Sequence, residues 1–104
     1  MKLTKLTGIK DEVRDAVLVR DSYEEAPCCV YCGSPHNIEI HHYVERSRGG
    51  IGREQNLICL CHKCHTKLHA GDEQIKEYCK AYLKDFYKGW CESKQIARKE
   101  YKDD

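Results

Sequence analysis

The stretch that decides the fold is Cys-Leu-Cys-His-Lys-Cys-His-Thr-Lys-Leu-His, at residues 59–69. Its cysteine pair, Cys61 and Cys64, has a counterpart upstream in Cys29 and Cys32, and two residues separate the cysteines of each pair. This spacing lets one tight turn direct both sulfurs at a single ion, and four thiolates are the donor set of closed structural zinc sites. The two pairs therefore predict a zinc knuckle with one structural Zn²⁺.

The four remaining cysteines are open to other interpretations. Cys28 and Cys59 lie close enough to the two pairs to replace one of the four ligands. Cys79 and Cys91 are expected to be small buried apolar residues, the commonest role of a free cysteine. A disulfide scaffold is the remaining alternative, although C-x2-C pairs in a reducing compartment favour metal.

All six histidines fall in the middle third of the chain, which points to a shared chemical role. His65 and His69 are four residues apart, so on a helix they project from one face and can bind one ion. His41 and His42 are adjacent on an expected strand, and their rings must therefore point to opposite sides. One of these two can bind metal while the other acts across the substrate pocket. Two further histidines are expected at the surface or behind the ligands: His36 and His62.

Hydrophobic periodicity predicts a hairpin between the cysteine pairs. Residues 37–44 alternate apolar and polar side chains, as in a strand that carries the double histidine to its end. Residues 57–60 predict a second short strand that pairs with the first. The intervening segment, residues 46–53, is glycine-rich and basic, and a flexible loop is expected there.

Helices are expected on both flanks. Residues 11–20 fit a short amphipathic helix with Asp11 as its N-cap, and residues 64–70 can begin a helix that stops at the following glycine. The strongest helical pattern runs over residues 75–86. Residues 90–104 are polar and lysine-rich, so a frayed helix or tail is predicted.

Several motifs together resemble a known family, the HNH endonucleases, of the small stand-alone type found in phages and bacteria. In chain order they are EIHHYV at 39–44, RSRGG at 46–50, EQNL at 54–57, LCHKCH at 60–65 and His69. The resemblance covers roughly residues 28–70. It implies an α+β chain with a small ββα-metal (His-Me finger) domain, stapled by the zinc knuckle and flanked by N- and C-terminal helices.

The resemblance also implies roles for individual residues. His42 would be the general base that activates water, and His41 would be a ligand of one catalytic divalent cation. His65 and His69 would complete that metal site, as in the colicin nuclease domains, and Asn56 would hold the loop and orient the base. Many relatives carry aspartate where this chain has His41, so Mg²⁺, Mn²⁺, Ni²⁺ and Zn²⁺ all stay open as the working ion.

Length and composition indicate one domain that needs such a staple. The chain has 104 residues, and a domain of this size buries only about two-thirds of its unfolded surface. Three segments are expected: residues 1–27 as lead-in and helix, 28–70 as the HNH core, and 71–104 as C-terminal helix and basic tail. No apolar run approaches the roughly 20 residues of a membrane span, and no secretory leader is evident, so a cytoplasmic location in a bacterial host or phage system is expected.

The expected function is metal-dependent hydrolysis of DNA phosphodiester bonds, by nicking or double-strand cleavage, with low sequence specificity. Arg46 and Arg48 are the candidate phosphate contacts, because guanidinium groups bind phosphate in a fork. The net charge of +1 does not itself identify a nucleic-acid partner. Double-stranded DNA is the expected partner, with phage packaging proteins as possible further partners and no membrane.

Two alternatives keep the zinc knuckle without the chemistry. One is a non-catalytic nucleic-acid-binding module, which would differ from an enzyme by a missing base or metal ligand. The other is a zinc-ribbon adaptor that binds protein through the face formed by Tyr78, Tyr82 and Phe86. The adaptor predicts stable association through the C-terminal helix and no second metal.

Overall fold

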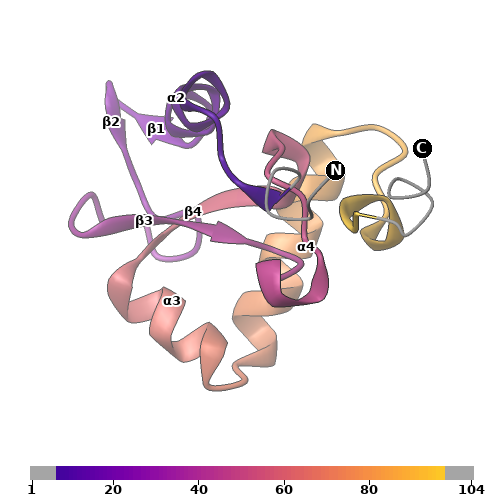
Figure 1. Ribbon diagram of the computed structural model, residues 1–104. Coiled ribbons are helices and arrows are strands. Elements are labelled where there is room, and N and C mark those ends of the chain that lie inside the picture. Colours follow the sequence, from indigo (N-terminus) through magenta and orange to yellow (C-terminus); the bar gives the residue numbers. More distant parts are fainter. Residues whose placement is uncertain (1–6, 98–104) are drawn as a thin grey trace.

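A two-stranded antiparallel hairpin lies at the centre of the structure, a computed structural model that describes residues 7–97 (Figure 1). Its strands are β3 (Ile38–His42) and β4 (Leu57–Cys61), with Ile38 opposite Cys61 and His42 opposite Leu57. The other helices and strands are α2 (Asp11–Arg20), β1 (Ser22–Tyr23), β2 (Ala26–Pro27), α3 (His62–His69) and α4 (Glu73–Phe86). Three short 3-10 helices complete the fold: η1 (Arg46–Arg48), η2 (Glu54–Asn56) and η3 (Glu92–Gln95).

Strand β4 is buried on both faces, and its two faces serve two apolar clusters. Ile58 and Leu60 belong to the larger cluster, which includes Ile75 and Leu83 of α4. The alternate residues Leu57 and Cys59 pack with Val17 of α2 in the smaller cluster. Side chains of a strand alternate between its faces, so one short strand holds helices on both sides. The predicted hairpin is confirmed, and α3 follows directly from its second strand.

The three helices expected from periodicity are present, with shifts at their ends. Helix α2 has Lys10 rather than Asp11 at its N-cap position, and no side chain caps it there. Helix α3 begins at His62, two residues before the expected start, because the Cys61 sulfur accepts a hydrogen bond from the backbone N–H of Cys64 and caps the helix. Helix α4 is capped by the Asp72 carboxylate, which accepts from the N–H of Ile75.

The prediction of a frayed tail from residue 90 onward is wrong for the part that the structure describes. Trp90 is only 8% exposed, and its indole N–H donates to the backbone carbonyl of Gln55 at 2.7 Å. Ile96 forms a β-bridge with Gly50. The loop at 46–53, predicted to be flexible, is therefore held by a backbone contact to this segment. Polar composition concealed this packing because the contacts are mostly made by backbone groups. The predicted lead-in before residue 7 and the basic run after residue 97 lie outside the described residues.

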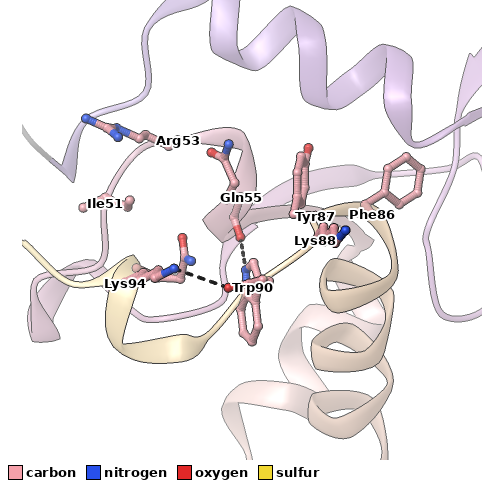
Figure 2. A pocket seen from close by; sticks show the side chains of 10 residues that line it. Ile51, Arg53, Gln55, Phe86, Tyr87, Lys88, Trp90 and Lys94 are labelled. Carbon is pink, nitrogen blue, oxygen red and sulfur yellow. Dashed lines mark hydrogen bonds between the residues drawn. The ribbon is translucent and has the colours of Figure 1, made fainter.

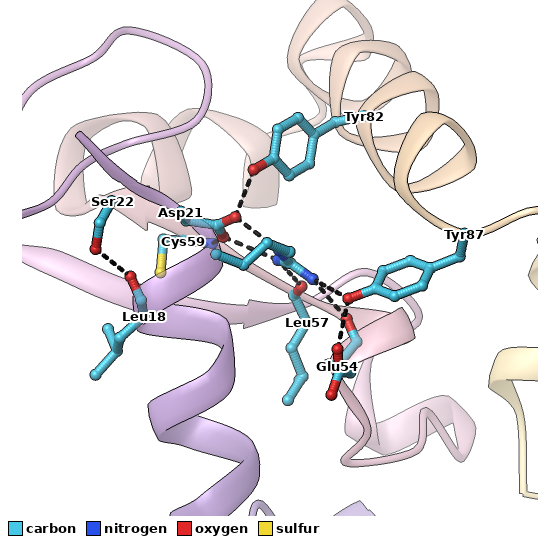
Figure 3. Close-up of polar contacts among 9 residues, drawn as sticks. Leu18, Asp21, Ser22, Glu54, Leu57, Cys59, Tyr82 and Tyr87 are labelled. Atoms are coloured by element: carbon cyan, nitrogen blue, oxygen red, sulfur yellow. Dashed lines mark hydrogen bonds and ion pairs between the residues drawn. The ribbon is translucent and has the colours of Figure 1, made fainter.

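A buried polar network, which no sequence pattern predicted, ties α2 and α4 to the hairpin (Figure 3). The carboxylate of Asp21 accepts hydrogen bonds from the Arg20 guanidinium, the Tyr82 hydroxyl and the Cys59 backbone N–H. Arg20 also donates to the backbone carbonyls of Glu54 and Leu57. The network therefore fixes β4 against both helices and satisfies a buried charge with a full set of partners.

Between residues 7 and 97, no helix has both the length and the apolar character required to cross a bilayer.

Candidate functional site

The two cysteine pairs meet at the open end of the hairpin. The sulfurs of Cys29, Cys32, Cys61 and Cys64 all lie within 4.8 Å of one another. Cys32 and Cys61, from different pairs, are 3.6 Å apart at sulfur. Tetrahedral zinc with Zn–S bonds of about 2.3 Å places its sulfurs roughly 3.8 Å apart. The donor set and its spacing therefore fit a zinc ion, and all four residues predicted as ligands are brought together.

Backbone geometry prepares the knuckle for thiolates. The N–H of Cys32 points to the Cys29 sulfur at 3.4 Å, and the N–H of Cys64 points to the Cys61 sulfur at the same distance. Burial disfavours a charged Cys29, but backbone N–H donors, first that of Cys32, outweigh it and lower the pKa of Cys29 to about 7. The turn thus stabilises the anionic form of Cys29, whereas burial raises the pKa of Cys64.

The other cysteines stand apart from this cluster. All eight cysteines lie within the described residues and are free thiols, so the disulfide alternative is not supported. Cys59 is fully buried in the smaller apolar cluster with Val17, and the thiol of Cys28 contacts the carbonyl of Ala26. Cys79 is buried in the core as expected, whereas Cys91 is only half-buried, since the segment around it lies at the surface.

Three of the predicted metal-binding histidines converge on one point beside α3. His41 at the end of β3 and His65 and His69 on α3 offer ring nitrogens that lie within 4.8 Å of one another. The His65 Nε2 atom is 3.1 Å from His41 Nδ1 and 3.0 Å from His69 Nε2. Three nitrogens at the usual 2.0–2.1 Å from a tetrahedral metal are roughly 3.3 Å apart, so the cluster has the dimensions of an ion site.

The electrostatics of the cluster favour a neutral ring at His41. Burial lowers the pKa of His41 to about 3, with a further contribution from the neighbouring charges of His65 and His69. The Nδ1 atom of His65 lies 2.6 Å from the carboxylate of Glu39, which can only accept, so this nitrogen carries the proton. The Nε2 atom of His65 is left to face the other two rings. A carboxylate behind a metal-ligating imidazole is a common way to fix its tautomer.

His42 points away from this cluster, as expected for the second residue of an adjacent pair on a strand. Its Nε2 lies 2.8 Å from the backbone carbonyl of Thr7, and a carbonyl can only accept, so Nε2 carries the proton and Nδ1 carries the lone pair. Burial lowers the pKa of His42; the Thr7 carbonyl acts in the opposite direction, and the charge of Arg46 lowers it further. His42 is thus a half-buried, uncharged base with a defined tautomer.

Asn56 holds the loop that separates the two strands. It is fully buried, and its Oδ1 accepts from the Val44 N–H at 2.8 Å. Its Nδ2 donates to the carbonyls of Val44 and Ile51, at 3.1 and 2.9 Å. In addition, the Asn56 carbonyl accepts from the N–H of Tyr43. Asn56 therefore closes the loop onto the strand end that carries the double histidine, without touching either imidazole.

A cleft of about 180 Å³ opens beside the histidine cluster. His41 and His69 line it together with Glu45, Arg48 and Lys76. The Glu45 carboxylate lies 3.4 Å from the Nδ1 of His69. Of the two arginines predicted to hold phosphate, Arg48 thus borders the histidine cluster, while the charge of Arg46 acts on His42.

The remaining two histidines, His36 and His62, are exposed, as expected. One of them, His62, contacts the carboxylate that also holds His65. His62 Nδ1 lies 2.9 Å from the second carboxylate oxygen of Glu39, and the side chain is 69% exposed.

Sequence reasoning missed three contributors to this site: Glu39, Glu45 and Thr7. Glu39 could have been found, because it precedes His41 by two residues and therefore shares its face of β3. Thr7 contributes only its backbone carbonyl, which carries no sequence signal.

A ββα unit, with a histidine cluster between its first strand and its helix and a four-cysteine cluster at its base, defines the ββα-metal class of domain. Comparison with known families agrees, since residues 29–71 match the family described as HNH endonuclease. This part of the chain is therefore an HNH domain.

Two curated proteins show local similarity to the chain. Anaredoxin from a Nostoc species is 46% identical over 35 residues, which make up 34% of this chain and 46% of that protein. The type IV methyl-directed restriction enzyme EcoKMcrA from Escherichia coli K12 is 37% identical over 46 residues, 44% of this chain and 16% of the enzyme. The chain thus spans less than half of the length of either relative.

Proposed function

We propose that this chain is a metal-dependent endonuclease that hydrolyses DNA phosphodiester bonds with low sequence specificity. The observation that carries the proposal is the division of the double histidine between two sides of β3. His41 faces a cluster of ring nitrogens with the dimensions of an ion site, and His42 faces a carbonyl that leaves it an uncharged base. An in-line attack on phosphorus needs these two elements: a positioned base and a counter-charge for the phosphate and the leaving oxygen.

His42 would act as the general base. The Thr7 carbonyl holds the proton on Nε2, so the Nδ1 lone pair can take a proton from the attacking water. The lowered pKa keeps this imidazole neutral at physiological pH. General base catalysis of this kind contributes about 10² to 10⁴ in rate. Asn56 would support the base indirectly by closing the loop that follows it.

His41, His65 and His69 would hold the catalytic divalent cation, with Glu39 fixing the tautomer of His65. When bound, such an ion neutralises charge on the phosphate and on the departing oxygen. An all-imidazole donor set suits zinc, nickel and other transition metals better than magnesium. The structural zinc would be held separately by the cysteine cluster.

Arg46 and Arg48 would bind the phosphates that flank the scissile bond. Both lie on η1, which follows the strand that carries the double histidine, and both are exposed. Guanidinium groups bind phosphate oxygens in a fork, and such contacts are independent of sequence. The similarity to a restriction enzyme supports a DNA substrate, although it covers only part of that protein.

The test is cleavage of supercoiled plasmid with Mg²⁺, Mn²⁺, Ni²⁺ or Zn²⁺ added in turn. His42→Ala removes the base, and His36→Ala is the matched control because His36 is exposed and lies outside both clusters. We expect nicking by the wild type and the control, and a loss of about 10² or more in the His42 variant. The zinc content and the circular dichroism spectrum of all three proteins are compared, to verify that neither variant has lost the fold.

The result that contradicts the proposal is no cleavage by the wild type with any ion. Binding of a labelled duplex under the same conditions would then favour the non-catalytic nucleic-acid-binding module. Calorimetric titration of the zinc-loaded protein with Ni²⁺ further distinguishes the metal-dependent nuclease from the non-catalytic module. One additional ion should bind to the wild type, and affinity should fall sharply in His65→Ala.

A further inference from the structure

A second cavity, of about 380 Å³, lies on a different part of the molecule and shares no lining residue with the cleft at the histidine cluster (Figure 2). One wall comes from the loop before β4, with Ile51, Arg53 and Gln55. The other wall comes from the end of α4 and the segment that follows it, which includes Trp90 and Lys94. The cavity exists because the segment predicted to be a frayed tail packs back against the loop.

The charge of the cavity selects an anion. Arg53, Lys88 and Lys94 line it, and no carboxylate is among its ten lining residues. Each of these three side chains is exposed. Lys94 makes only a long contact of 3.5 Å to the carbonyl of Gly89, and the other two have no ion pair within residues 7–97. Three cations of this kind can neutralise phosphate oxygens.

The walls also offer surfaces for a planar group with N–H donors. Phe86, Tyr87 and Trp90 contribute aromatic rings. Gln95 is only 4% exposed; its amide N–H donates to the Cys91 carbonyl, while its Oε1 accepts no hydrogen bond from the residues described. Buried acceptors are nearly always satisfied, so an orphan oxygen in a cavity wall favours a ligand or water that brings a donor. A nucleobase has both a face that stacks on aromatic rings and N–H donors at its edge.

The cavity is connected to the proposed base through the loop that forms its wall. Ile51 and Arg53 line the cavity on either side of Gly52. Gly52 packs so closely on the backbone of residues 7 and 8 that an added Cβ would lie 2.0 Å from the Gly8 carbonyl. The carbonyl of Thr7 in that same segment holds His42. The loop that lines the cavity therefore packs directly on the backbone segment that holds the imidazole.

We infer that this cavity binds one nucleotide of the substrate strand next to the bond that is cut, with its base against the aromatic wall and its phosphate on Arg53, Lys88 and Lys94. This inference rests on the proposed nuclease function and deepens it. The occupant is an unpaired nucleotide, because the base can reach an aromatic wall only outside the stack of a duplex. The site would therefore give a preference for single-stranded or distorted nucleic acid.

The fluorescence of Trp90 reports directly on binding in the cavity, since Trp90 is the only tryptophan of the chain. Its fluorescence is followed while the zinc-loaded protein, without added divalent cation, is titrated with a short single-stranded oligodeoxynucleotide. The comparison ligand is an oligonucleotide of equal length and charge with abasic residues. We expect saturable quenching by the first ligand, and binding of the abasic ligand that is about tenfold weaker or more and does not quench.

A charge-matched pair of variants tests the phosphate contacts. Lys88→Gln with Lys94→Gln removes two cations from the cavity, and Lys10→Gln with Lys84→Gln removes two exposed cations elsewhere. Each lost phosphate contact on a single strand reduces the slope of log affinity against log salt by about 0.7, so the cavity variant should lose about 1.4. The control variant should keep the slope and the quenching of the wild type.

Three outcomes would overturn the inference. They are equal affinity for the abasic ligand, an unchanged Trp90 signal in a saturated complex, and equal salt slopes for the two variants. The plasmid assay is independent of this readout, because it needs no response of Trp90. Cleavage without a Trp90 response refutes the cavity and leaves the nuclease in place. A base-dependent response without cleavage under any ion supports the nucleotide site and refutes the nuclease.

Discussion

Replacing Asn56 with aspartate tests whether the buried amide holds the loop between the strands. The change keeps the shape of the side chain and the acceptor for the Val44 N–H, but it removes both donors of Nδ2. The carbonyls of Val44 and Ile51 then lose a hydrogen bond inside a site that is fully buried. A buried polar group left without its hydrogen bond costs about 1–3 kcal/mol. The two carbonyls together therefore predict a loss of about 2–6 kcal/mol in the free energy of unfolding.

The loss should depend on pH in a defined direction. Burial without a cationic partner raises the pKa of the new carboxyl above its unfolded value of about 3.9. A group with a raised folded pKa contributes stability below its unfolded pKa and loses it as the pH rises through the folded pKa. The protonated acid can also donate one hydrogen bond. The destabilisation of Asn56→Asp should therefore be larger at pH 8 than at pH 5.5.

Urea unfolding followed by circular dichroism measures the free energy of unfolding for the wild type and the variant at both pH values. Taking the difference from the wild type at each pH removes the effect of pH on the zinc knuckle. Asn37→Asp is the control, because Asn37 is exposed and its φ of 53° is one that aspartate tolerates. The reasoning is refuted if the two variants lose the same free energy, or if the loss in Asn56→Asp does not grow with pH.

Three further changes probe other parts of the molecule. In Gly50→Ala the new Cβ would lie 1.6 Å from the Val44 carbonyl, so urea unfolding should show a loss of about 3 kcal/mol or more; a loss below 1 kcal/mol would contradict the close approach. Asp21→Asn removes the anion that neutralises a buried guanidinium and should cost about 3–5 kcal/mol in the same assay, and a neutral result would show that the network is dispensable. Iodoacetamide at pH 8 should modify Cys91 before Cys59 in mass spectra, because the Ser93 hydroxyl lowers the pKa of Cys91 whereas burial raises that of Cys59 to about 12; the reverse order would argue against this burial.

Much of the fold and of the candidate site could be predicted because the information is local. The spacing of Cys61 and Cys64 on one turn, and of His65 and His69 on one helix face, follows from backbone geometry alone. The alternation along residues 37–44 and the short apolar run at 57–60 predicted a hairpin, and β3 and β4 have that pairing. The roles of the histidines as base and ligands stay predictions that the plasmid and calorimetric experiments must test.

Other features could not be predicted because they join distant parts of the chain. The packing of Trp90 on the loop before β4, and the bridge from Ile96 to Gly50, depend on how the end of α4 returns to the hairpin. Composition favoured a tail there, since single apolar residues among many lysines give no periodic signal. The second cavity, and the grouping of cations around it, exist only because the segment after α4 packs back on the hairpin.

The sequence by itself determined the two candidate ligand sets, the ββα order and the opposite orientation of His41 and His42, because each depends on residue type and spacing over a few positions. Tertiary structure alone decided which groups support them. The Thr7 carbonyl sets the tautomer of His42, and the Glu54 and Leu57 carbonyls receive Arg20. Every residue has a backbone carbonyl, so these contacts leave no mark in the sequence and appear only when distant segments pack together.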